Sequence, residues 1–544
     1  IYNYKEIKRK LTYQNYKWRG SSDTEVLLQA WCKWGVKCID QLEGMFSFVI
    51  WDKKDKELFV VRDRLGEKPL YYTYKNNDFG FSSRPSQIFS IFPETSRNYD
   101  NQSLRYYLES GYIPSDFSIF KDIKKLKAGH YLQIKNNKFK IQKYWEINNI
   151  ETNQNFYKKS NHEIIEELDE LLTESVKKRM RSDVPFGAFL SGGIDSSLVV
   201  AIMTKLSNNP IKTFTIGYNV KKYDESEHAE IISKYLKTDH YCKQLNEKDL
   251  INLLPDFLKN YDEPFFDSAS FPTMAVSKLA KKKVSVILTG DGGDELFGGY
   301  HYYKIIKLLN YLNIFPKSFL NLISKLLIKF PSHKLKLLSS ALQRDSTEDK
   351  FSYIRSIIKN FENVLDQNII DDTNGLKQLF ENCGSSFPKK IEETEKAMRL
   401  DTLFTLNDDY LQKTDMATMA YSLEGRTPFL SHNIVEFAAS MPCDLKLNLF
   451  NSKIILKKLA YNYIPKKILE KPKRGFGVPL DSWLRNELKE WSSERIYDKK
   501  NYENLPINHN KVIDLYECHL SGKRNVQPLL WAILMLLEFN SKRF

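Results

Sequence analysis

The sequence lacks the features that mark zinc-binding, membrane-spanning and secreted proteins. Its six cysteines form no CxxC pair and no Cys/His cluster with the spacing of zinc ligands, so we expect reduced thiols. No apolar run approaches the roughly 18 residues that a helix needs to cross a bilayer, so we expect no transmembrane segment. The opening IYNYKEIKRK contains no apolar core of the kind that a signal peptide has. Together these absences predict a cytoplasmic protein.

Long Gly, Ser or Pro tracts are also absent, and the composition is that of a folded protein. Of the 544 residues, 42% are apolar and 28% are charged, which allows a sizeable core in each of two or three domains. Lys and Arg exceed Asp and Glu by 82 to 68, a net charge of +14. Because this excess is mostly lysine and is scattered, it indicates a solvated surface rather than a nucleic-acid partner.

One basic stretch, Tyr302–Leu342, stands apart from this scatter. Its lysines alternate with Leu, Ile and Phe in the pattern of amphipathic helices, interrupted at Pro316 and Pro331. The lysines are Lys304, Lys307, Lys317, Lys325, Lys329, Lys334 and Lys336. Packed helices whose lysine stems cover apolar surface are the simpler interpretation, and contact with a membrane surface is the alternative.

The first part of the chain, residues 1–147, has the pattern of an antiparallel sheet domain. A helical stretch at Asp23–Trp34 precedes two runs rich in aromatic and β-branched residues, Leu42–Asp52 and Lys56–Asp63, which flank a polar turn. A second pair of such runs flanks the turn-forming sequence NND at 76–78. The pattern predicts two hairpins of one sheet domain.

A polar, linker-like stretch at 148–161 separates this domain from a second one, residues 162–544. Helices there alternate with short apolar strands rich in β-branched residues, which is typical of a doubly wound parallel sheet. The predicted strands are Val184–Leu190, Ile211–Tyr218 and Lys283–Gly290. After Gly299 the pattern is almost entirely helical.

The string FLSGGIDSS, Phe189–Ser197, lies where a predicted strand passes into a helix. Small residues let the backbone approach an anion, successive N–H groups point into the turn, and the helix N-terminus adds its positive dipole end. We therefore expect a phosphate site, although the lysine of a GxxxxGK[ST] P-loop is absent. Asp195 would repel phosphate unless Mg²⁺ lies between them. A plain helix cap by Ser191 or Asp195 explains single residues of the string but not the whole of it.

A second string, LTGDGGDELFGGY at Leu288–Tyr300, also follows a strand. Because ligands of open α/β sheets bind at this carboxyl edge, we expect the two strings to meet in one pocket. Asp291, Asp294 and Glu295 are interleaved with glycines, which gives an acidic turn able to hold a divalent metal or to accept a proton. A calcium loop is the competing interpretation, but its ligand spacing is not matched.

Four strings, in this order, resemble the asparagine synthetase family that hydrolyses glutamine. They are SGGIDSS, TGDGGDELFGGY, SLEGRTPFL and KPKRGFGVPL, spread over roughly three hundred residues. The first is similar to the pyrophosphate loop of N-type ATP pyrophosphatases. The resemblance implies that ATP is cleaved between its α and β phosphates to give an acyl-AMP and pyrophosphate, with ATP and Mg²⁺ as cofactors.

The resemblance also implies roles for individual residues. Those that match contacts to ATP and pyrophosphate are Leu190, Ser191, Gly192, Gly193, Asp195, Ser196, Ile216, Thr289 and Gly290. Those that match metal ligands are Asp195 and Asp294. Those that match catalytic groups are Asp291 as the base toward ammonia, Arg426 as the partner of a substrate carboxylate, and Lys473 as a cation at the phosphates. Asp291 stands where some members carry Glu, which is one methylene longer.

Three further strings, RGSSDTEVLLQAW, LEGMFSFVIWD and RDRLGEKPLYY, resemble the glutaminase domain of N-terminal-nucleophile amidotransferases. Asp23 matches the residue that binds the α-amino group of glutamine. The family's Cys after Met, its upstream Arg and its Asn-Gly oxyanion hole have no counterpart here, and Cys32 and Cys38 are internal. Because relatives carry NGEIYN and this chain opens at IYN without Met, we expect a fragment of a longer polypeptide. A natural ammonia-dependent enzyme is the alternative.

The resemblance as a whole implies a carbon–nitrogen ligase that makes asparagine from aspartate through β-aspartyl-AMP. Ammonia would come from glutamine in the intact protein and from solution for the chain as written. The alternative acceptor is a cell-envelope or polysaccharide carboxylate, and the segment Tyr261–Thr273 is where the two acceptors would be told apart. A catalytically silent scaffold is the third hypothesis. The expected partners are small molecules, namely ATP, aspartate, and glutamine or ammonia; nucleic acid is not expected, and a homodimer stays open.

Overall fold

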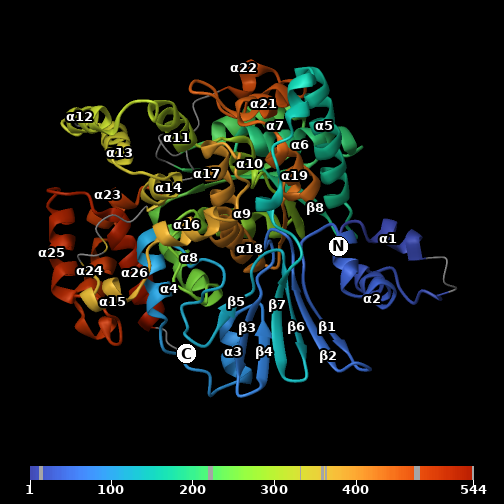
Figure 1. The fold of residues 1–544 in the computed structure, drawn as a ribbon, viewed down its shortest axis with the longest axis horizontal. Helices are drawn as coiled ribbons and strands as arrows, with labels where there is room; N and C mark the ends of the chain where they lie inside the picture. Colours follow the sequence, from blue (N-terminus) through green and yellow to red (C-terminus); the bar gives the residue numbers. More distant parts are fainter. Residues whose placement is uncertain are drawn as a thin grey trace.

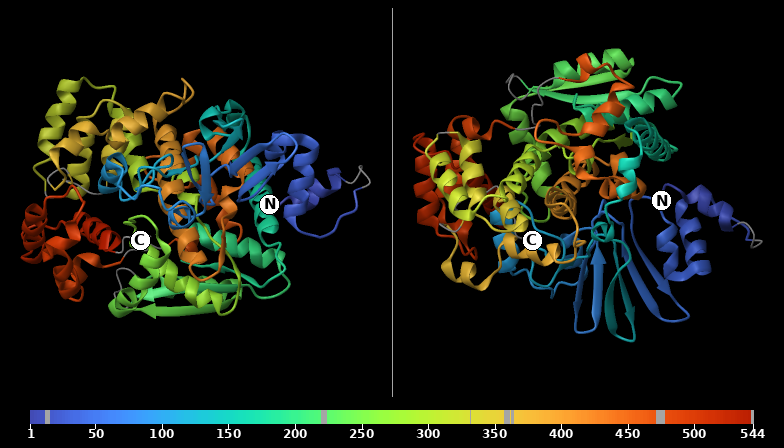
Figure 2. Two further views of the ribbon diagram at one scale, coloured as in Figure 1. Left: turned by 90° about the horizontal axis from the view of Figure 1, so that it is seen from below. Right: turned by 45° about the horizontal axis from the view of Figure 1, so that its top comes forward.

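The computed structural model describes residues 1–11, 16–218, 224–330, 332–356, 361, 364–470 and 478–541 (Figure 1). Within these residues the chain forms two antiparallel sheets and one parallel sheet. The antiparallel sheets fan out at one end of the molecule, and helices surround the parallel sheet (Figures 1 and 2).

The two antiparallel sheets pack face to face in the N-terminal region. Their strand orders are β1-β2-β6-β7 and β4-β3-β5. The strands are β1 Ser47–Asp52, β2 Glu57–Arg62, β3 Tyr71–Lys75, β4 Asp78–Ser82, β5 Lys124–Lys125, β6 His130–Lys135 and β7 Lys138–Lys143. Val60, Leu70 and Leu132 form part of a core shared by both sheets. Asn76 and Asn77 have φ of 53° and 69°, so the predicted turn between β3 and β4 is a two-residue hairpin turn.

Helices α1 (Tyr4–Leu11) and α2 (Asp23–Trp34) cover the outer face of the four-stranded sheet. Trp31 of α2 makes edge contacts with Phe48 and Phe59, which point away from Val60 because strand side chains alternate. The helix predicted at 23–34 is therefore present with the expected bounds. Two more helices of this region, α3 (Pro85–Ile91) and α4 (Asn101–Ser110), follow β4.

The five-stranded sheet of the second region is parallel throughout, with the order β10-β9-β8-β11-β12. Its strands are β8 Phe186–Phe189, β9 Lys212–Tyr218, β10 Asp239–Leu245, β11 Val286–Leu288 and β12 Glu424–Arg426. The interspersed helices are α5 Asn161–Arg179, α6 Ile194–Leu206, α7 Ser226–Leu236, α8 Glu247–Asn260, α9 Ser270–Lys281 and α10 Gly293–Phe297. Phe214 and Ile287 face a core with α8 and α9, whereas Val286 and Leu288 face a core with α5, α6 and α7. The predicted helix-covered parallel sheet is thereby confirmed.

Two of these five strands were not predicted from the sequence. β10 is an edge strand whose side chains are mostly exposed, so it carries no apolar alternation. β12 has only three residues, Glu424, Gly425 and Arg426, and pairs with β11 alone. A strand this short and polar forms because β11 offers it hydrogen bonds, not because its own sequence favours it.

The rest of the described chain is helical, as predicted. The helices are α11 His301–Leu312, α12 Lys317–Leu327, α13 His333–Leu342, α14 Thr347–Arg355, α15 Gln367–Asp372, α16 Leu376–Gly384, α17 Glu393–Asp401, a π-helix Thr402–Leu411, α18 Gln412–Met419, α19 His432–Ser440, α20 Cys443–Lys446, α21 Ile454–Tyr461, α22 Lys466–Leu469, α23 Leu480–Arg485, α24 Lys489–Tyr497, α25 His509–Leu520 and α26 Gln527–Ser541. Within the part of the chain that the structure covers, none of them combines the length and apolarity needed to cross a membrane.

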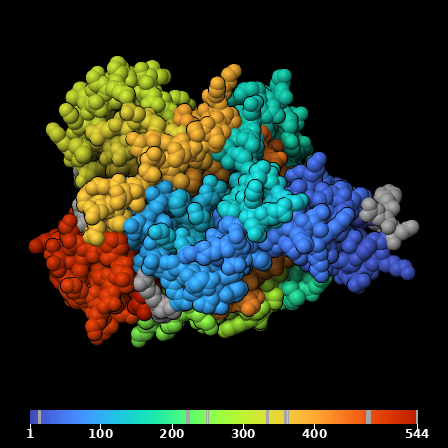
Figure 3. Space-filling view, turned by 60° about the horizontal axis from the view of Figure 1, so that its bottom comes forward, coloured from blue at the N-terminus to red at the C-terminus, as the bar shows by residue number. Residues whose placement is uncertain are grey.

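The N-terminal region is interleaved with these C-terminal helices. The Tyr107 hydroxyl of α4 donates to the Ala532 carbonyl of α26 over 2.9 Å, and Arg105 Nη1 donates to the Ile370 carbonyl of α15 over 2.6 Å. Figure 3 shows the light-blue surface of this region beside yellow, orange and red surfaces of the C-terminal half. The two regions therefore share one continuous surface of contact.

Candidate active site at the carboxyl edge of the parallel sheet

The turn after β8 has the geometry of an anion-binding loop. Gly192 has φ of 78°, a conformation that glycine adopts readily, and Gly193 is the N-cap of α6. The hydroxyl oxygens of Ser191 and Ser196 lie 3.0 Å apart, and Gly193 N donates to Ser191 Oγ over 3.3 Å. The first N–H groups of a helix have no partner within it, so those of α6 can bind a phosphate at this turn.

The turn after β11 touches the turn after β8, as the sequence predicted. A Cβ atom added to Gly290 would lie 2.7 Å from the backbone nitrogen of Ser196, and one added to Gly293 would lie 2.6 Å from Asp195 Cγ. Both distances are shorter than van der Waals contact, so only glycine fits at either position. The glycines of the second string are therefore explained by close packing against the first.

A cavity of about 290 Å³ opens where these turns meet. Its walls include Leu190, Ser191, Gly193, Asp195, Ser196, Ile216, Thr289, Gly290, Asp291, Asp294, Glu295, Tyr300, Lys413 and Thr414. A second cavity of about 460 Å³ shares Gly193, Asp195 and Asp294 with the first and is lined by Gly192, Lys453 and Lys457 as well. All nine predicted ATP contacts therefore line one or both of two adjoining cavities.

Asp195 and Asp294 converge on one cation, the ammonium group of Lys453. Lys453 Nζ lies 2.5 Å from Asp195 Oδ2 and 2.7 Å from Asp294 Oδ1. Burial alone would lower the pKa of Lys453, but the two carboxylates raise it well above its usual range. Lys453 also has φ of 52°, which residues with a side chain adopt at a cost in energy. No local pattern marks this residue, because it is one lysine of a Lys-rich segment 258 positions after Asp195.

The same two carboxylates are suited to Mg²⁺. They already direct oxygens at a single cation, which is the arrangement that a divalent ion would use. Among the described residues no group of three or more His, Cys, Asp or Glu side chains could hold a metal ion by itself. Magnesium is commonly bound by one or two carboxylates together with substrate phosphates and water, so two protein ligands are sufficient.

Asp291 is positioned at the cavity wall by two hydroxyl groups. Its Oδ2 accepts from Thr289 Oγ1 over 2.8 Å and from Thr414 Oγ1 over 3.1 Å. Both donors bind the same oxygen, which fixes the orientation of the carboxylate. Thr414 belongs to α18, so that helix sets the position of the predicted base.

Lys413, the neighbour of Thr414, is a second buried cation of the site. Its Nζ lies 3.0 Å from Asp267 Oδ2, in the segment predicted to determine the acceptor. Burial lowers the pKa of Lys413, but Asp267, Asp409 and Asp291 raise it beyond its ordinary value. Lys413 lies in a helix of mixed polar and apolar residues that matches no site motif, and it was missed from the sequence.

Glu295 is a buried carboxyl group of the same cavity. Its Oε1 accepts from the Tyr300 hydroxyl over 2.6 Å. Burial, and then the charges of Asp294 and Asp401, raise the pKa of Glu295 to about 8. Its surroundings therefore favour the protonated form.

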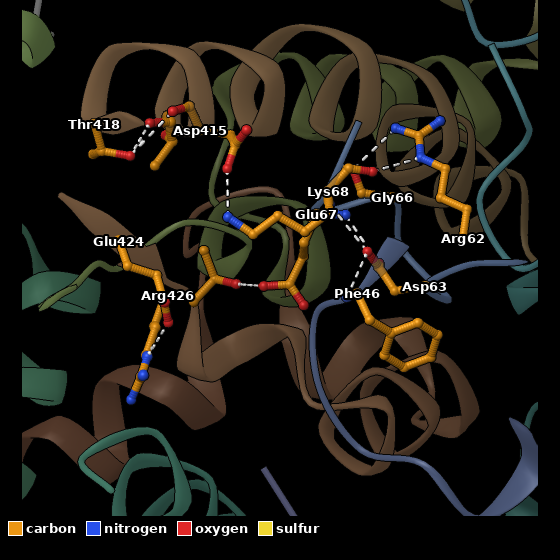
Figure 4. Close-up of polar contacts among 12 residues, drawn as sticks. Phe46, Arg62, Asp63, Gly66, Glu67, Lys68, Asp415, Thr418, Glu424 and Arg426 are labelled. Atoms are coloured by element: carbon orange, nitrogen blue, oxygen red, sulfur yellow. Dashed lines mark hydrogen bonds and ion pairs between the residues drawn. The ribbon is translucent and has the colours of Figure 1, made fainter. Parts of the chain in front are cut away.

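Arg426 lines neither of the two cavities, and its predicted role toward a substrate carboxylate stays a prediction. Its guanidinium donates to the carbonyls of Arg179 and Arg181 over 2.6 and 2.8 Å and pairs with Glu424 at 2.7 Å (Figure 4). Only its backbone serves the site, because the Arg426 carbonyl accepts from Thr289 N over 2.9 Å. The Arg426 side chain points toward α5, so its guanidinium donors are bound by groups of the protein itself.

Two predicted residues remain, Lys473 and Asp23. Lys473 falls outside the described residues, and its role stays a prediction. Asp23 lies at the start of α2, where its Oδ2 accepts from the α-ammonium group of Ile1 over 2.7 Å. The predicted role of Asp23 in binding glutamine stays a prediction.

A buried junction connects the N-terminal region to α18. The turn after β2 is organised by Asp63, whose carboxylate accepts from the backbone nitrogens of Glu67 and Lys68 over 2.9 and 3.0 Å (Figure 4). Lys68 Nζ then reaches Asp415 Oδ1 at 2.6 Å. The Thr427 hydroxyl, next to Arg426, donates to the carboxylate of Glu67. Asp415 directly follows Thr414, whose hydroxyl orients Asp291. The junction therefore ends one residue away from a residue that positions the predicted base.

Comparison with known proteins agrees with this geometry. The family description "Asparagine synthase" matches residues 167–541, and "Glutamine amidotransferase domain" matches residues 1–145. The chain is 30% identical to "Asparagine synthetase [glutamine-hydrolyzing] 1" of Bacillus subtilis, over 99% of this chain and 84% of the relative. It is 38% identical to "Putative asparagine synthetase [glutamine-hydrolyzing] 2" of Methanocaldococcus jannaschii, over 77% and 80%. It is 25% identical to "Amidase chry2" of Gibberella zeae, over 93% and 79%.

Proposed function

The chain belongs to the asparagine synthase family, and from this premise we propose that it amidates aspartate to asparagine with ATP. It is accordingly a carbon–nitrogen ligase, and glutamine is the nitrogen donor that the names of its relatives give. One observation carries the proposal. The two motif turns pack so closely that Asp195 and Asp294 bind one cation between two adjoining cavities.

The first step that we propose is formation of β-aspartyl-AMP. A β-carboxylate oxygen of aspartate attacks the α-phosphorus of ATP, and the bond from that phosphorus to the bridging oxygen breaks, so pyrophosphate leaves. Mg²⁺, when bound, would be held by Asp195 and Asp294 and would neutralise phosphate charge. The N–H groups of the Ser191–Ser196 turn bind the leaving pyrophosphate, and Lys453 and Lys473 stabilise the charge that it gains.

The second step is attack of ammonia on the activated carbonyl carbon. The attacking nitrogen loses a proton, which Asp291 accepts, and the bond between carbon and the AMP oxygen breaks. The hydroxyls of Thr289 and Thr414 support this role because they hold the acceptor oxygen in place. AMP therefore leaves with an oxygen that was part of the aspartate carboxylate.

The acceptor is recognised, in this proposal, by Lys413 rather than by Arg426. Lys413 lies in the cavity wall, and its partner Asp267 belongs to the 261–273 segment. Ala269 and Thr273 of the same segment also line the cavity. An ammonium group flanked by a carboxylate offers complementary charges to an amino acid, which carries both an ammonium and a carboxylate group. A sugar acid or another envelope carboxylate would offer no ammonium group to the carboxylate of Asp267.

The proposal is tested by supplying ATP, Mg²⁺ and ammonium with one acceptor at a time and measuring pyrophosphate. Aspartate is expected to release pyrophosphate and to yield asparagine, with glutamine tested as the nitrogen source in a parallel reaction. If pyrophosphate were released with a uronic acid but not with aspartate, the acceptor would be a sugar acid and the proposed activation by ATP would still hold. Absence of nucleotide binding would favour the scaffold hypothesis. The Asp294→Asn variant, which removes one of the two converging charges, is the matched negative control.

A further inference from the structure

The basic stretch 302–342 forms most of α11 and a helical hairpin of α12 and α13, whose role the synthetase chemistry leaves unexplained. Helices α12 and α13 pack on each other and on α11 through a small core that includes Leu320, Ala341 and Leu342. Ser324 and Ser339 exchange hydrogen bonds across that contact. Figure 1 shows the hairpin at the margin of the molecule, away from the antiparallel sheets.

Helix α12 is apolar on the outside as well as on the inside. Phe315, just before the helix, and Phe319, Leu322 and Leu326, within it, are here called the apolar stripe. The three helical residues are spaced by three and four positions and thus share one face. The four stripe residues are 47, 46, 57 and 54% exposed, whereas Leu320 on the packed face is 6% exposed. Phe315 and Phe319 contact each other with ring centroids 5.4 Å apart.

Exposed apolar side chains are concentrated in this segment. Of the 25 large hydrophobic residues that are exposed among the described part of the chain, eight lie between residues 311 and 330. Besides the stripe they are Tyr311, Ile314, Ile328 and Phe330. Scattered exposed apolar residues need no explanation, but a contiguous cluster of this kind marks an interaction surface.

The charge around the stripe has one sign. From 296 to 344 the sequence contains seven lysines and one arginine but no Asp or Glu. Lys325 and Lys329 are exposed beside the stripe, and Lys317, at the start of α12, pairs with Asp345 just beyond the acid-free stretch. A helix with one apolar face and flanking lysines is the pattern of helices that lie in the headgroup region of an anionic bilayer.

We propose that α12 and its flanking turns bind the surface of an anionic lipid bilayer. The apolar stripe enters the boundary between headgroups and acyl chains, and the lysines contact lipid phosphates. A second copy of this chain fits the same surface poorly, because a symmetric contact would bring two sets of lysines together. A nucleic acid would match the lysines but would leave Leu322 and Leu326 uncovered.

The test uses the full chain and sedimentation with vesicles of phosphatidylcholine alone or mixed with phosphatidylglycerol. We expect binding to the mixed vesicles only, weakened by high salt because ionic screening reaches the lysines. The triple variant Phe319→Ser, Leu322→Ser and Leu326→Ser should bind at least about tenfold more weakly. Its control replaces three exposed apolar residues of the antiparallel sheet, Trp51, Phe139 and Ile141, by Ser.

The charge contribution is tested by Lys325→Glu with Lys329→Glu. Each lysine near an anionic surface contributes about fivefold, so the double reversal should lower binding by about 25-fold or more. The control is Lys53→Glu with Lys54→Glu, two exposed lysines of the turn between β1 and β2. Every variant is compared by thermal unfolding to establish that it folds.

Three results would overturn the proposal. The wild type could bind both kinds of vesicle equally, or it could bind neither kind. The triple variant could also bind the mixed vesicles as tightly as the wild type does. A wild-type dimer in size-exclusion chromatography that the triple variant abolishes, with no vesicle binding, would instead assign the stripe to a contact between copies.

Discussion

At the scale of single residues, the most informative group is Lys453. It satisfies two carboxylates that would otherwise repel each other, and the same carboxylates are the proposed ligands of Mg²⁺. An ammonium group can therefore pre-organise the site before Mg²⁺ and ATP arrive. Glycine at 290 and 293 allows this arrangement because the two turns leave no room for a Cβ atom.

We predict that Lys453→Met lowers the kcat for pyrophosphate release by about a hundredfold or more, because it removes a preorganised cation next to the phosphates. Steady-state kinetics with ATP and aspartate measure the effect. Lys458→Met is the control, since Lys458 lies on helix α21, which directly follows its N-cap residue Lys453, but lines neither cavity. Equal losses in the two variants would contradict the role given to Lys453.

Asp291 should act in the second half of the reaction only. We predict that Asp291→Asn retains exchange of labelled pyrophosphate into ATP in the presence of aspartate, while asparagine formation falls by about a hundredfold. Asp291→Glu should restore amide formation, because it returns a carboxylate to the position. If both half-reactions fell together in Asp291→Asn, the residue would be a structural support and not the base.

Glu67 should make stability depend on pH. Burial raises the pKa of Glu67 to about 7, with Asp63 adding to the rise, so the folded protein keeps a proton that the unfolded chain releases near pH 4.5. This contribution to stability is complete below pH 4.5 and is lost as the pH rises through 7. It amounts to a few kcal/mol at most, since one pKa unit corresponds to about 1.4 kcal/mol.

The variant Glu67→Gln tests this directly, because glutamine resembles the protonated acid and can still accept from Thr427. Urea unfolding at pH 5 and pH 8 should show that the wild type loses more stability over this interval than the variant does. Identical losses would mean that Glu67 is ionised in the folded protein at both values.

At the scale of elements, α18 links the N-terminal region to the site. It carries Asp415, which pairs with Lys68, and Thr414, which orients Asp291. Movement of the turn after β2 would therefore reach the proposed base through a single helix. This is a physical route by which events in the amidotransferase region could affect the synthetase site.

We predict that Lys68→Met destabilises the protein by about 3 kcal/mol, because it leaves the mostly buried Asp415 without its partner. The double variant Lys68→Met with Asp415→Leu should recover most of that loss, which urea unfolding of the full cycle measures. Lys75→Met is the control, since the Lys75–Asp122 pair is half exposed and should contribute less than about 1 kcal/mol. Loss in the double variant equal to the sum of the single losses would show that the pair is not coupled.

The elements differ in how far the sequence predicted them. The helix at 23–34, strand β9 and the turn at Asn76 and Asn77 have strong local patterns, and each appears with nearly the predicted bounds. Strand β12 has no local pattern, because its hydrogen bonds come from β11. The surroundings of the Arg426 side chain were not predictable for the same reason. The residue type suits a substrate carboxylate, but only the three-dimensional position of β12 shows that α5 and Glu424 use its donors.

At the scale of the whole molecule, the site is assembled from segments that are remote in sequence. The convergence of the two motif turns was predictable, because parallel strands end at one edge of a sheet. The contributions of Lys413 and Lys453 were not, because long helical stretches return to that edge by paths that no local pattern records. The significance of the net charge of +14 is likewise visible only in the fold, where the acid-free stretch 296–344 includes the hairpin of α12 and α13 at the margin of the molecule.

The central claim is that an aspartate carboxylate oxygen attacks the α-phosphorus of ATP and that ammonia then displaces AMP. Aspartate labelled with ¹⁸O in its β-carboxylate tests this most directly, by mass spectrometry of the phosphorus-containing products. The account predicts one ¹⁸O atom in each AMP molecule, unlabelled pyrophosphate, and AMP and asparagine in equal amounts. Release of ADP with label in inorganic phosphate, or AMP without label, would contradict it.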